Sequence, residues 1–497
     1  MSLLGIDVGS TNIKAGLFDI NGNLLCVSSR FTPTHIDKDG FYYINPDKVT
    51  SIIIELLNDI SQKGYNITSI GITSMAEAGL LFDVKNNRPA TPIIPWYDKS
   101  CIEYVNNFIS RYDTEKRFYE TGVYPSFKYG IFKIQWLIDK YGLDVKNLIW
   151  LNVADLVALF FTNKAFTDYS LATRTYAFNI VKKQWDSNLL TELKIQNIFP
   201  ECDWAGLITY KIKEDFNNYG ISKNAKVAIA GHDHLCASIA VGADDLKTVL
   251  DSIGTAETLV GIRENTPLNK NDRESGMSFG CHILKDKLYW MGGLSSSGGS
   301  IEWFRKKFLN GVDYDKLIEL LINEDKPTGI LYFPYLNGSG APKPNINTKA
   351  VFIGIDSETS ESRLLKAIIE GTNYEIKWIY EMVEKYINSS IENIVAVGGG
   401  TKNKYWMQTK ADILNKKVIT FKVADITLLG AAIIGGISNN VYKDLKDAKQ
   451  TVSNVIDEIY YPNNEYINEY DRYFAEYINL QNSLRSYYDR INNCGVD

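Results

Sequence analysis

The segment Gly5-Ile6-Asp7-Val8-Gly9-Ser10-Thr11-Asn12-Ile13-Lys14 joins two apolar stretches through a polar turn that contains glycine. Residues 2–8 and 13–18 have the composition of buried strands, so the segment predicts a β-hairpin. Asp7 stands near the end of the first strand, and hydroxyl groups with free backbone N–H groups follow it. Such a turn can hold phosphate oxygens while the carboxylate binds hydrated Mg²⁺. Taken alone, the segment fits an ordinary hairpin with a surface aspartate equally well.

The residues that follow extend this hairpin into a mixed sheet. Asn21-Gly22 is a strong hairpin turn, and it predicts a further strand over residues 24–28. Asn45-Pro46 then opens a stretch whose apolar side chains recur at helical spacing up to Ile60. Residues 67–73 have the composition of another short apolar strand. Strands followed by a helix and a further strand indicate an α/β sheet covered by helices.

A similar order of elements returns in the second half of the chain. A strand predicted over residues 247–252 runs into the turn Gly254-Thr255, and a second strand follows that turn. Residues 394–397 are typical of a buried strand and end in Gly398-Gly399-Gly400. Two halves that each open with a strand, a glycine turn and a strand suggest a duplicated core.

Length and composition limit the classes of protein to consider. A chain of 497 residues favours at least two domains, and we place their boundary near residue 243, giving domains 1–242 and 243–497. Lys+Arg 53 against Asp+Glu 59 give a formal net charge of -6, without a basic cluster. Binding of nucleic acid or of an anionic membrane is therefore not expected. No signal-peptide pattern or long apolar run is present, which favours a cytoplasmic protein.

The glycine turns of the second half resemble the first hairpin in their chemistry. Gly254-Thr255 follows a strand, and Gly398–Gly400 follows another and is succeeded by Thr401 and Asn403. Consecutive glycines lose much backbone entropy on folding, which makes sense where a phosphate or a flat ligand must approach the backbone. A flexible turn is the alternative for each segment alone. The three turns in this order favour a nucleotide site between two domains.

Gly231-His232-Asp233-His234 follows an apolar strand predicted at residues 227–230. The two histidines and the aspartate could bind zinc, but His35 and His282 lie far away in sequence without metal-ligand spacing. We favour Asp233 as a general base presented at the end of that strand. Transfer of a phosphoryl group to an alcohol needs a carboxylate that accepts the hydroxyl proton.

Other common active-site motifs are missing or wrongly placed. The chain has no GxxxxGK[ST] segment and no GxGxxG segment after a strand, which excludes a P-loop and a dinucleotide-binding fingerprint. Gly276-Met277-Ser278-Phe279-Gly280 matches GxSxG, but a nucleophile elbow needs a strand before it and a helix after it. A polar stretch precedes this segment and a strand pattern follows it, so a hydrolase is not expected.

Together these segments resemble the FGGY family of carbohydrate kinases, within the superfamily of sugar kinases, Hsp70 and actin. The resemblance covers nearly the whole chain. It rests, in chain order, on residues 5–14, Trp96-Tyr97-Asp98, Lys133-Ile134-Gln135-Trp136, 167–175, Gly254-Thr255, 298–303, 334–342, 354–370, Gly398–Gly400, 408–414 and 429–432. Gly130 and Arg363 depart from the residues usual in the two family signatures. The resemblance implies an α/β fold with two ribonuclease-H-like, actin-like ATPase domains flanking a central catalytic cleft.

The resemblance also implies a role for each candidate residue. Asp233 would be the catalytic base, and Asp7 would bind Mg²⁺, partly through water. ATP would be bound by Ser10, Thr11, Lys14, Gly254, Thr255, Gly299, Glu302, Gly399, Gly400 and Asn403. The sugar would contact Glu77, Trp96, Tyr124, Asp233 and His234. ATP and Mg²⁺ are thus the expected cofactors, a small sugar or polyol is the expected partner, and a homodimer is a further expectation.

These motifs leave the acceptor open. Residues 73–79 vary with the sugar in this family, and glycerol kinases carry an Arg-Glu pair where this chain has Ala76-Glu77. Met75-Ala76-Glu77 also departs from the Gln-Met-His run of xylulokinases. We therefore expect a kinase acting on a sugar, sugar acid or polyol, with xylulokinase as the alternative. A nucleotide-binding regulator of the actin and Hsp70 type, without kinase activity, is a further and less favoured alternative.

The C-terminal segment carries aromatic and apolar side chains at alternating spacings of four and three. They are Tyr466, Tyr470, Tyr473, Tyr477, Leu480 and Leu484. This stripe predicts a helix packed on its own domain, in preference to a surface that binds a partner.

Overall fold

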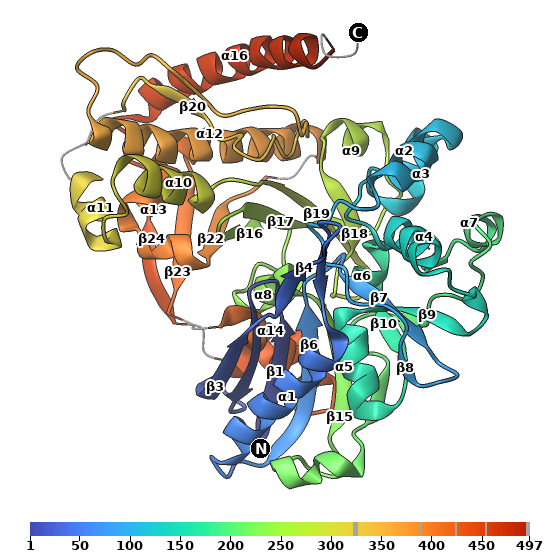
Figure 1. Cartoon of the computed structure of the whole chain (residues 1–497). Coiled ribbons are helices and arrows are strands. Elements are labelled where there is room, and N and C mark those ends of the chain that lie inside the picture. Colours follow the sequence, from blue (N-terminus) through green and yellow to red (C-terminus); the bar gives the residue numbers. More distant parts are fainter. Residues whose placement is uncertain (322–326, 388–389, 423–424, 453–454, 494–497) are drawn as a thin grey trace.

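The computed structural model describes residues 1–321, 327–387, 390–422, 425–452 and 455–493. Within these residues, each half of the chain forms one large sheet (Figure 1). The first sheet has the order β14 (Thr209–Lys211), β15 (Lys226–His232), β6 (Ile67–Ser74), β1 (Ser2–Val8), β2 (Asn12–Phe18), β3 (Leu24–Phe31). The second has the order β18 (Ser278–Cys281), β19 (Lys287–Leu294), β17 (Glu257–Glu264), β16 (Thr248–Ile253), β22 (Asn393–Val397), β23 (Lys417–Phe421), β24 (Ile456–Tyr460).

The two sheets share one arrangement of strands. In the first, β1 pairs antiparallel with β2 and parallel with β6, and β6 pairs parallel with β15. In the second, β16 pairs antiparallel with β17 and parallel with β22, and β22 pairs parallel with β23. This common topology confirms the predicted duplication of an α/β core.

Helices and short strands surround the sheets. The helices of the first half are α1 (Pro46–Ser61), α2 (Ile102–Arg111), α3 (Thr114–Thr121), α4 (Gly130–Tyr141), α5 (Val153–Thr162), α6 (Tyr169–Thr173), α7 (Ser187–Glu192) and α8 (Asp233–Ala240). Those of the second half are α9 (Lys270–Glu274), α10 (Gly298–Phe308), α11 (Tyr314–Leu321), α12 (Glu361–Ile387), α13 (Lys404–Leu414), α14 (Ile426–Ser438), α15 (Leu445–Thr451) and α16 (Ile467–Asn493). The short strands include β4 (Thr34–Ile36), β5 (Tyr42–Ile44), β7 (Gly79–Asp83), β8 (Arg88–Pro89), β9 (Leu148–Asn152), β10 (Phe166–Asp168), β11 (Phe178–Asn179), β12 (Gln184–Trp185), β13 (Glu201–Asp203), β20 (Leu331–Phe333) and β21 (Val351–Ile353).

Helix α1 begins where the sequence predicts it. The Asn45 side chain accepts a hydrogen bond from the backbone N–H of Asp47 over 2.8 Å, and Pro46 occupies the first turn. An asparagine cap followed by proline satisfies the free N–H groups of a helix start. The apolar face of α1 is buried, including Val49 and Ile60, as its spacing indicates.

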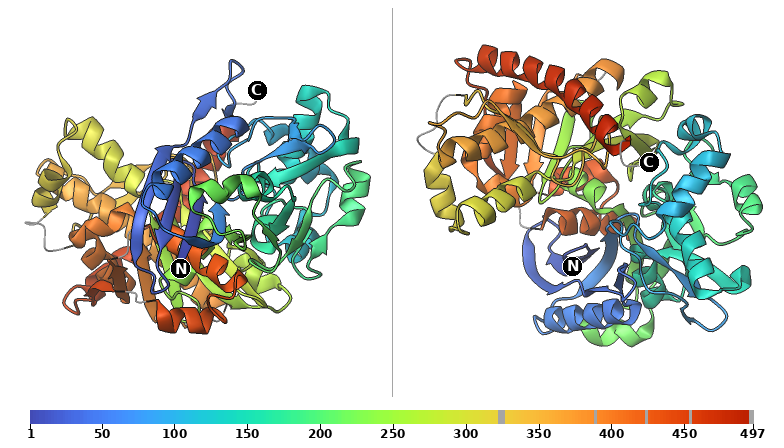
Figure 2. Two further views of the ribbon diagram at one scale, coloured as in Figure 1. Left: turned by 90° about the horizontal axis from the view of Figure 1, so that it is seen from below. Right: turned by 45° about the horizontal axis from the view of Figure 1, so that its top comes forward.

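Helices α1 and α14 cover opposite faces of the first sheet (Figure 2). Leu4 and Ile6 of β1 belong to the same apolar cluster as Leu56 of α1. Gly5 points the other way, because side chains alternate along a strand. A Cβ atom on Gly5 would lie 2.1 Å from the backbone oxygen of Leu428 in α14. A helix from residues 426–438 therefore completes the core of the N-terminal sheet.

Helix α16 packs on its own half of the molecule, as predicted. Tyr470, Phe474 and Tyr477 are buried in a cluster with Tyr374 of α12. The hydroxyl of Tyr477 donates a hydrogen bond to Glu375 Oε2 over 2.6 Å. The aromatic stripe is therefore occupied by intramolecular contacts. Across the described residues, no helix is both long and apolar enough to cross a membrane.

Candidate active site

Asp7 and Asp233 lie at the carboxyl ends of parallel strands that share one neighbour, β6. In the register of the sheet, Asp7 of β1 is paired with Thr73 of β6, and Thr73 is paired with Gly231 of β15. The Thr73 hydroxyl donates a hydrogen bond to the carbonyl of Gly231 over 2.6 Å. Ligands of α/β sheets bind outside the carboxyl ends of the strands. The fold thus brings to one edge the two aspartates that the sequence singles out.

Gly231 turns the chain from β15 toward α8. Its φ of 102° lies in a region that favours glycine, and the register of β15 against β6 shifts between Ile229 and Gly231. A Cβ atom at this position would lie 2.5 Å from Ile283 Cγ2. This bulge needs glycine for both reasons, and Asp233 follows as the first residue of α8.

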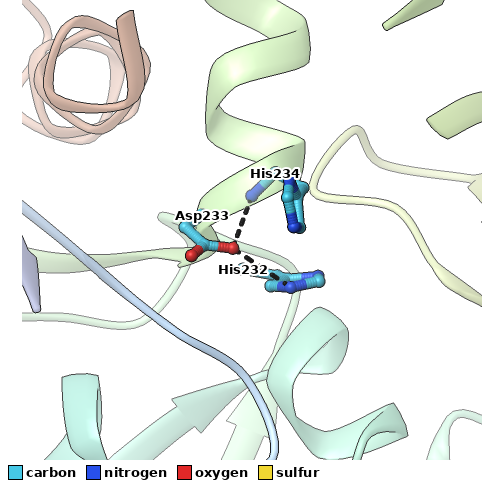
Figure 3. A group of neighbouring side chains, drawn as sticks. All are labelled: His232, Asp233 and His234. Atoms are coloured by element: carbon cyan, nitrogen blue, oxygen red, sulfur yellow. Dashed lines mark hydrogen bonds and ion pairs between the residues drawn. The ribbon is translucent and has the colours of Figure 1, made fainter. Parts of the chain in front are cut away.

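The carboxylate of Asp233 is held between two histidines (Figure 3). Its Oδ1 atom accepts a hydrogen bond from the backbone N–H of His234 over 2.7 Å and lies 3.1 Å from His232 Nε2. Burial opposes ionisation, but the interactions with His234 and His232 lower the pKa of Asp233 to about 2. Burial also lowers the pKa of His234. Asp233 is therefore ionised at neutral pH and able to accept a proton.

The ligand atoms of His232, Asp233 and His234 lie within 4.8 Å of one another, so the geometry alone is compatible with a metal ion. The ring of His232 contacts Oδ1 of the Asp233 carboxylate, whereas His234 reaches the same oxygen through its backbone N–H and not through its ring. These two contacts fix the orientation of the carboxylate, as a general base requires.

Asp7 has an unusual environment for a carboxylate. Its Oδ1 atom is buried and has no hydrogen-bond partner among the described residues. Burial and then the charge of Asp233 raise the pKa of Asp7 well above its usual value, while Lys14 opposes the shift. A buried carboxylate oxygen without a partner is costly unless a cation or a proton balances it. Carboxylate oxygens are ligands that Mg²⁺ prefers, so this position fits the predicted magnesium site.

The turn between β1 and β2 is closed by its own backbone. The N–H of Gly9 donates to the carbonyl of Asn12 over 3.0 Å, and the Thr32 hydroxyl donates to the carbonyl of Gly9 over 2.7 Å. Ser10 is half-buried and Thr11 is exposed at the tip of this turn. Their hydroxyls are thus presented next to the strand that carries Asp7.

Lys14 joins the first hairpin to the second half of the chain. It lies opposite Asp7 in the β1–β2 register, and its Nζ donates to Asp425 Oδ1 over 2.5 Å. Asp425 stands at the N-cap position of α14 without a capping hydrogen bond from its side chain, and its φ of 57° is one that aspartate tolerates better than most residues. The sequence carries no signal for Asp425, because 411 positions separate the two residues.

The glycine turns of the second half also gather at strand ends. The N–H of Gly298 donates to the carbonyl of Gly254 over 3.1 Å, and that of Gly299 donates to the carbonyl of Thr255 over 3.0 Å. The start of α10 is therefore bonded to the β16–β17 turn. Gly398, with a φ of 95°, ends the neighbouring parallel strand, and its Cβ would lie 2.5 Å from the carbonyl oxygen of Ile253.

Gly399 and Gly400 differ in what surrounds them. A Cβ on Gly399 would meet no atom within 4 Å, whereas a Cβ on Gly400 would lie 2.4 Å from Ile253 Cγ2. Asn403, further along, caps α13 by accepting a hydrogen bond from the N–H of Trp406 over 3.0 Å. Gly399 therefore borders open space, while Gly400 is fixed by packing.

Glu302 lies on α10, three positions after Gly299, and its carboxylate is already occupied. It accepts hydrogen bonds from Arg305 over 2.7 and 2.8 Å and from the hydroxyl of Tyr314 over 2.8 Å. Lys306 Nζ also lies 3.0 Å away. These donors, Arg305 first, lower the pKa of Glu302. The side chain of this predicted ATP-binding residue is therefore occupied by contacts with neighbouring residues of the same half of the chain.

A buried charge cluster underlies the Gly254-Thr255 turn. Lys410 of α13 contacts Asp251 of β16 and Glu257 of β17, and all three side chains are fully buried. Ser297 also donates a hydrogen bond to Glu257. Burial and Glu257 raise the pKa of Asp251 to about 8, against the opposing charge of Lys410. The cluster ties both strands of this turn to α13.

On the predicted sugar side, Glu77 pairs with Arg174. Arg174 Nε donates to Glu77 Oε1 over 2.7 Å, and both side chains are buried. Arg174 also donates to the hydroxyl of Tyr289 over 3.3 Å, and its guanidinium lies 5.2 Å from the ring centre of Tyr129. Tyr289 belongs to the second sheet, so this group connects the two halves of the chain.

Trp96 joins the same group through two lysines. Lys133 is fully buried and donates from Nζ to the carbonyls of Glu77 and of Pro95, the latter over 2.8 Å. Lys128 Nζ lies 5.4 Å from the ring centre of Trp96. The loops that carry Glu77 and Trp96 therefore both meet the start of α4.

Tyr124 lies apart from these contacts. Its hydroxyl donates to the backbone carbonyl of Arg273, and its ring packs 4.7 Å from the ring centre of Phe118. Arg174 and Lys133 both contact Glu77, and in the sequence they occur only within segments that resemble the family. Lys128 stands beside Tyr129, at the start of α4, where no sequence pattern marks it.

The GxSxG segment does not form a nucleophile elbow. Ser278 is the first residue of β18, so a strand, and not a helix, follows Ser278. The expectation that this serine is no hydrolase nucleophile is consistent with this placement.

Comparisons with known proteins identify the family of the chain. The pattern of the FGGY family of carbohydrate kinases, N-terminal domain, matches residues 2–240, and that of the C-terminal domain matches residues 252–438. A glycerol kinase of Saccharolobus islandicus is 27% identical and covers 90% of each chain, and a xylulose kinase of Lactococcus lactis is 25% identical and covers 95% of each. The structure of a ligand-bound xylulose kinase from Lactobacillus acidophilus has the same fold, with a TM-score of 0.90 at 22% identity over 99% of both chains. The chain therefore belongs to the FGGY family of carbohydrate kinases, as its sequence motifs predict.

Proposed function

We propose that this protein transfers the terminal phosphate of ATP to a hydroxyl of a sugar, sugar acid or polyol, with Asp233 as the general base. The observation that carries this proposal is the meeting of Asp7 and Asp233 at one edge of the first sheet. Asp233 is ionised and oriented by two histidines, so it can accept the proton of an attacking hydroxyl. Phosphoryl transfer otherwise depends mainly on positioning and on stabilisation of charge.

Asp7 is the proposed ligand of Mg²⁺, partly through water. Its unpartnered buried oxygen and the neighbouring Asp233 carboxylate form a site with excess negative charge. Mg²⁺ bound with ATP would neutralise charge on the phosphates during transfer. Asp7 would thus hold the ion at the carboxyl ends of the strands, where Asp233 would accept the proton.

The nucleotide would be held by turns from both halves of the chain. Ser10, Thr11 and Lys14 would contact the transferred phosphate, and Gly254 with Thr255 would bind phosphate from the second half. Gly299, Glu302, Gly399, Gly400 and Asn403 would line the adenosine side. The hydrogen bond from the N–H of Gly299 to the carbonyl of Thr255 supports a shared site for these two residues. Gly399 is the member that borders open space, and it suits close approach of a flat ligand.

The acceptor would lie near Asp233, His234, Glu77 and Trp96, with Tyr124 as a further predicted contact. Relatives named glycerol kinase and xylulose kinase resemble this chain to nearly the same degree, so resemblance does not select between their substrates. Xylulokinase activity is the alternative to a different sugar, sugar acid or polyol. Three further expectations stay predictions: a domain boundary near residue 243, a cytoplasmic location, and a homodimer that binds no nucleic acid.

The proposal is tested by ADP release from Mg-ATP in the presence of ketoses, aldoses, polyols and sugar acids. We expect turnover that depends on one acceptor, and a loss of about 100-fold to 10,000-fold in Asp233→Ala. ATP binding by that variant should persist. Near-normal turnover in Asp233→Ala would remove this residue from the role of base, whereas acceptor-independent ADP release would favour an ATPase of the regulator type.

A further inference from the structure

Lys128 is a cation that forms no ion pair with the described residues of the site. It precedes α4, is half-buried, and holds Nζ 5.4 Å from the ring centre of Trp96. No carboxylate of the described residues lies within 4.0 Å of this ammonium group. Burial is the largest cause lowering the pKa of Lys128, and the charge of Glu77 opposes this shift without cancelling it. The lysine is therefore available to an anion.

The other charges around Lys128 are already balanced. Glu77 is bound by Arg174 in a buried ion pair, with an Nε–Oε1 distance of 2.7 Å. Asp98 accepts hydrogen bonds from the backbone of Tyr42 and Ser100, at 2.7 and 3.0 Å, and it lies within electrostatic reach of Lys133. Glu77 and Asp98 thus offset Arg174 and Lys133. Glu77 acts on Lys128 as well, but its carboxylate is paired with Arg174, and Lys128 has no ion-pair partner of its own among the described residues.

This excess charge adjoins the place where the acceptor must bind. His234 interacts with both Asp233 and Glu77, and Glu77 interacts with Lys128. These residues connect the proposed base to the indole of Trp96. Trp96 offers a flat surface to the C–H groups of a sugar, and Lys128 stands at that surface with donors only.

We infer that the acceptor is a sugar acid, and that Lys128 recognises its carboxylate while a hydroxyl faces Asp233. This inference rests on the proposed kinase function and narrows its substrate class. A neutral polyol would accept a hydrogen bond from Lys128 but would leave its charge uncompensated in a partly desolvated place. A carboxylate satisfies both the charge and the donors of the ammonium group.

The decisive experiment compares acids and neutral compounds of equal carbon number. ADP release from Mg-ATP is measured with gluconate and glucitol, xylonate and xylitol, and arabinonate and arabinitol, together with xylulose and glycerol. We expect turnover of at least one acid, and a decrease of at least about 30-fold in its kcat/KM in Lys128→Gln. Lys128→Arg should restore part of this activity, because it keeps the charge.

Lys99→Gln is the matched control. Lys99 is an exposed lysine whose ammonium lies 5.7 Å from the ring centre of Phe127, and it takes no part in the proposed site. We expect its kcat/KM to equal that of the unaltered protein. The melting temperature and the ATP affinity of Lys128→Gln should also be unchanged, which separates recognition from a folding defect.

The outcomes separate the two proposals. Turnover of a neutral compound in preference to its matched acid, with no effect of Lys128→Gln, would overturn the sugar-acid inference and leave the kinase proposal standing. Absence of turnover with every acid and neutral compound would contradict the proposed function, and with it the inference.

Discussion

Lys14 and Asp425 form an ion pair that joins the two halves of the chain, with 2.5 Å between Nζ and Oδ1. Asp425 immediately precedes α14, and Lys14 lies opposite Asp7 in the first hairpin. A lysine proposed to contact the transferred phosphate is thus already paired with a carboxylate. A phosphate group in the site would compete with Asp425 for this ammonium.

Substitutions of the two residues of this pair should therefore have different effects on catalysis and on ATP affinity. Lys14→Met is expected to lower kcat about 100-fold, because a positive charge beside the transferred phosphate is lost. Asp425→Asn should keep or increase ATP affinity, because it releases the lysine toward phosphate. Steady-state kinetics and ATP titration of both variants test this. Equal losses of ATP affinity in the two variants would show that the ion pair itself, rather than the available lysine, supports binding.

Asp7→Asn should abolish turnover and yet stabilise the ligand-free protein near pH 8. The pKa of Asp7 is raised in the folded state by burial and by Asp233. The stability associated with such a group is present below its unfolded pKa and is lost as the pH rises through its folded pKa. Asparagine carries no charge, so the variant avoids this loss. The melting temperature of the variant minus that of the unaltered protein should therefore increase as the pH rises from about 4 to about 8.

Melting curves in EDTA across this pH range provide the measurement. An Asp7→Asn variant that melts below the unaltered protein near pH 8 would show that the carboxylate contributes structural bonds, which would contradict its assignment as a site for a cation.

Gly399 and Gly400 should respond differently to the same added methyl group. Gly399→Ala is expected to fold normally, because its Cβ would meet no atom within 4 Å. If this position borders the nucleotide, ATP affinity should fall. Gly400→Ala should instead lose about 1–3 kcal/mol of stability, because its Cβ would lie 2.4 Å from Ile253 Cγ2. Chemical unfolding and ATP titration distinguish the two, and unchanged ATP affinity in Gly399→Ala would place the nucleotide elsewhere.

Lys410→Met should destabilise the protein by about 3–5 kcal/mol, because it leaves two buried carboxylates without their cation. The pKa of Asp251 is already raised to about 8 by burial and by Glu257. Stability linked to this group is lost as the pH rises from its unfolded pKa toward that value. Without Lys410 the loss should be larger at pH 8 than at pH 6, as urea unfolding at both pH values would show.

The control for this variant is Lys404→Met. Its pair with Glu458 is exposed to solvent, so its loss should change the free energy of unfolding very little. A similar loss in both variants would mean that the buried cluster does not support the second glycine turn as described.

Much of the fold was predictable from neighbouring residues. The helix start at Asn45-Pro46, the first hairpin and the strand before Asp233 all follow from local chemistry and side-chain periodicity, and the structure has them. The packing of α14 on the N-terminal sheet was not predictable. An apolar helix contains no information about which of two sheets it will cover.

The strands, the glycine turns and the aspartate at the end of β15 follow from the order of residues alone, because they depend on residues a few positions apart. The pairing of charges follows only from the folded arrangement. Glu77 meets Arg174 across 97 positions, Lys14 meets Asp425 across 411, and Lys410 meets Asp251 across 159. Ion pairing depends on distance and burial and not on order along the chain. The distances that pair these residues and leave Lys128 without an ion pair therefore exist only after folding.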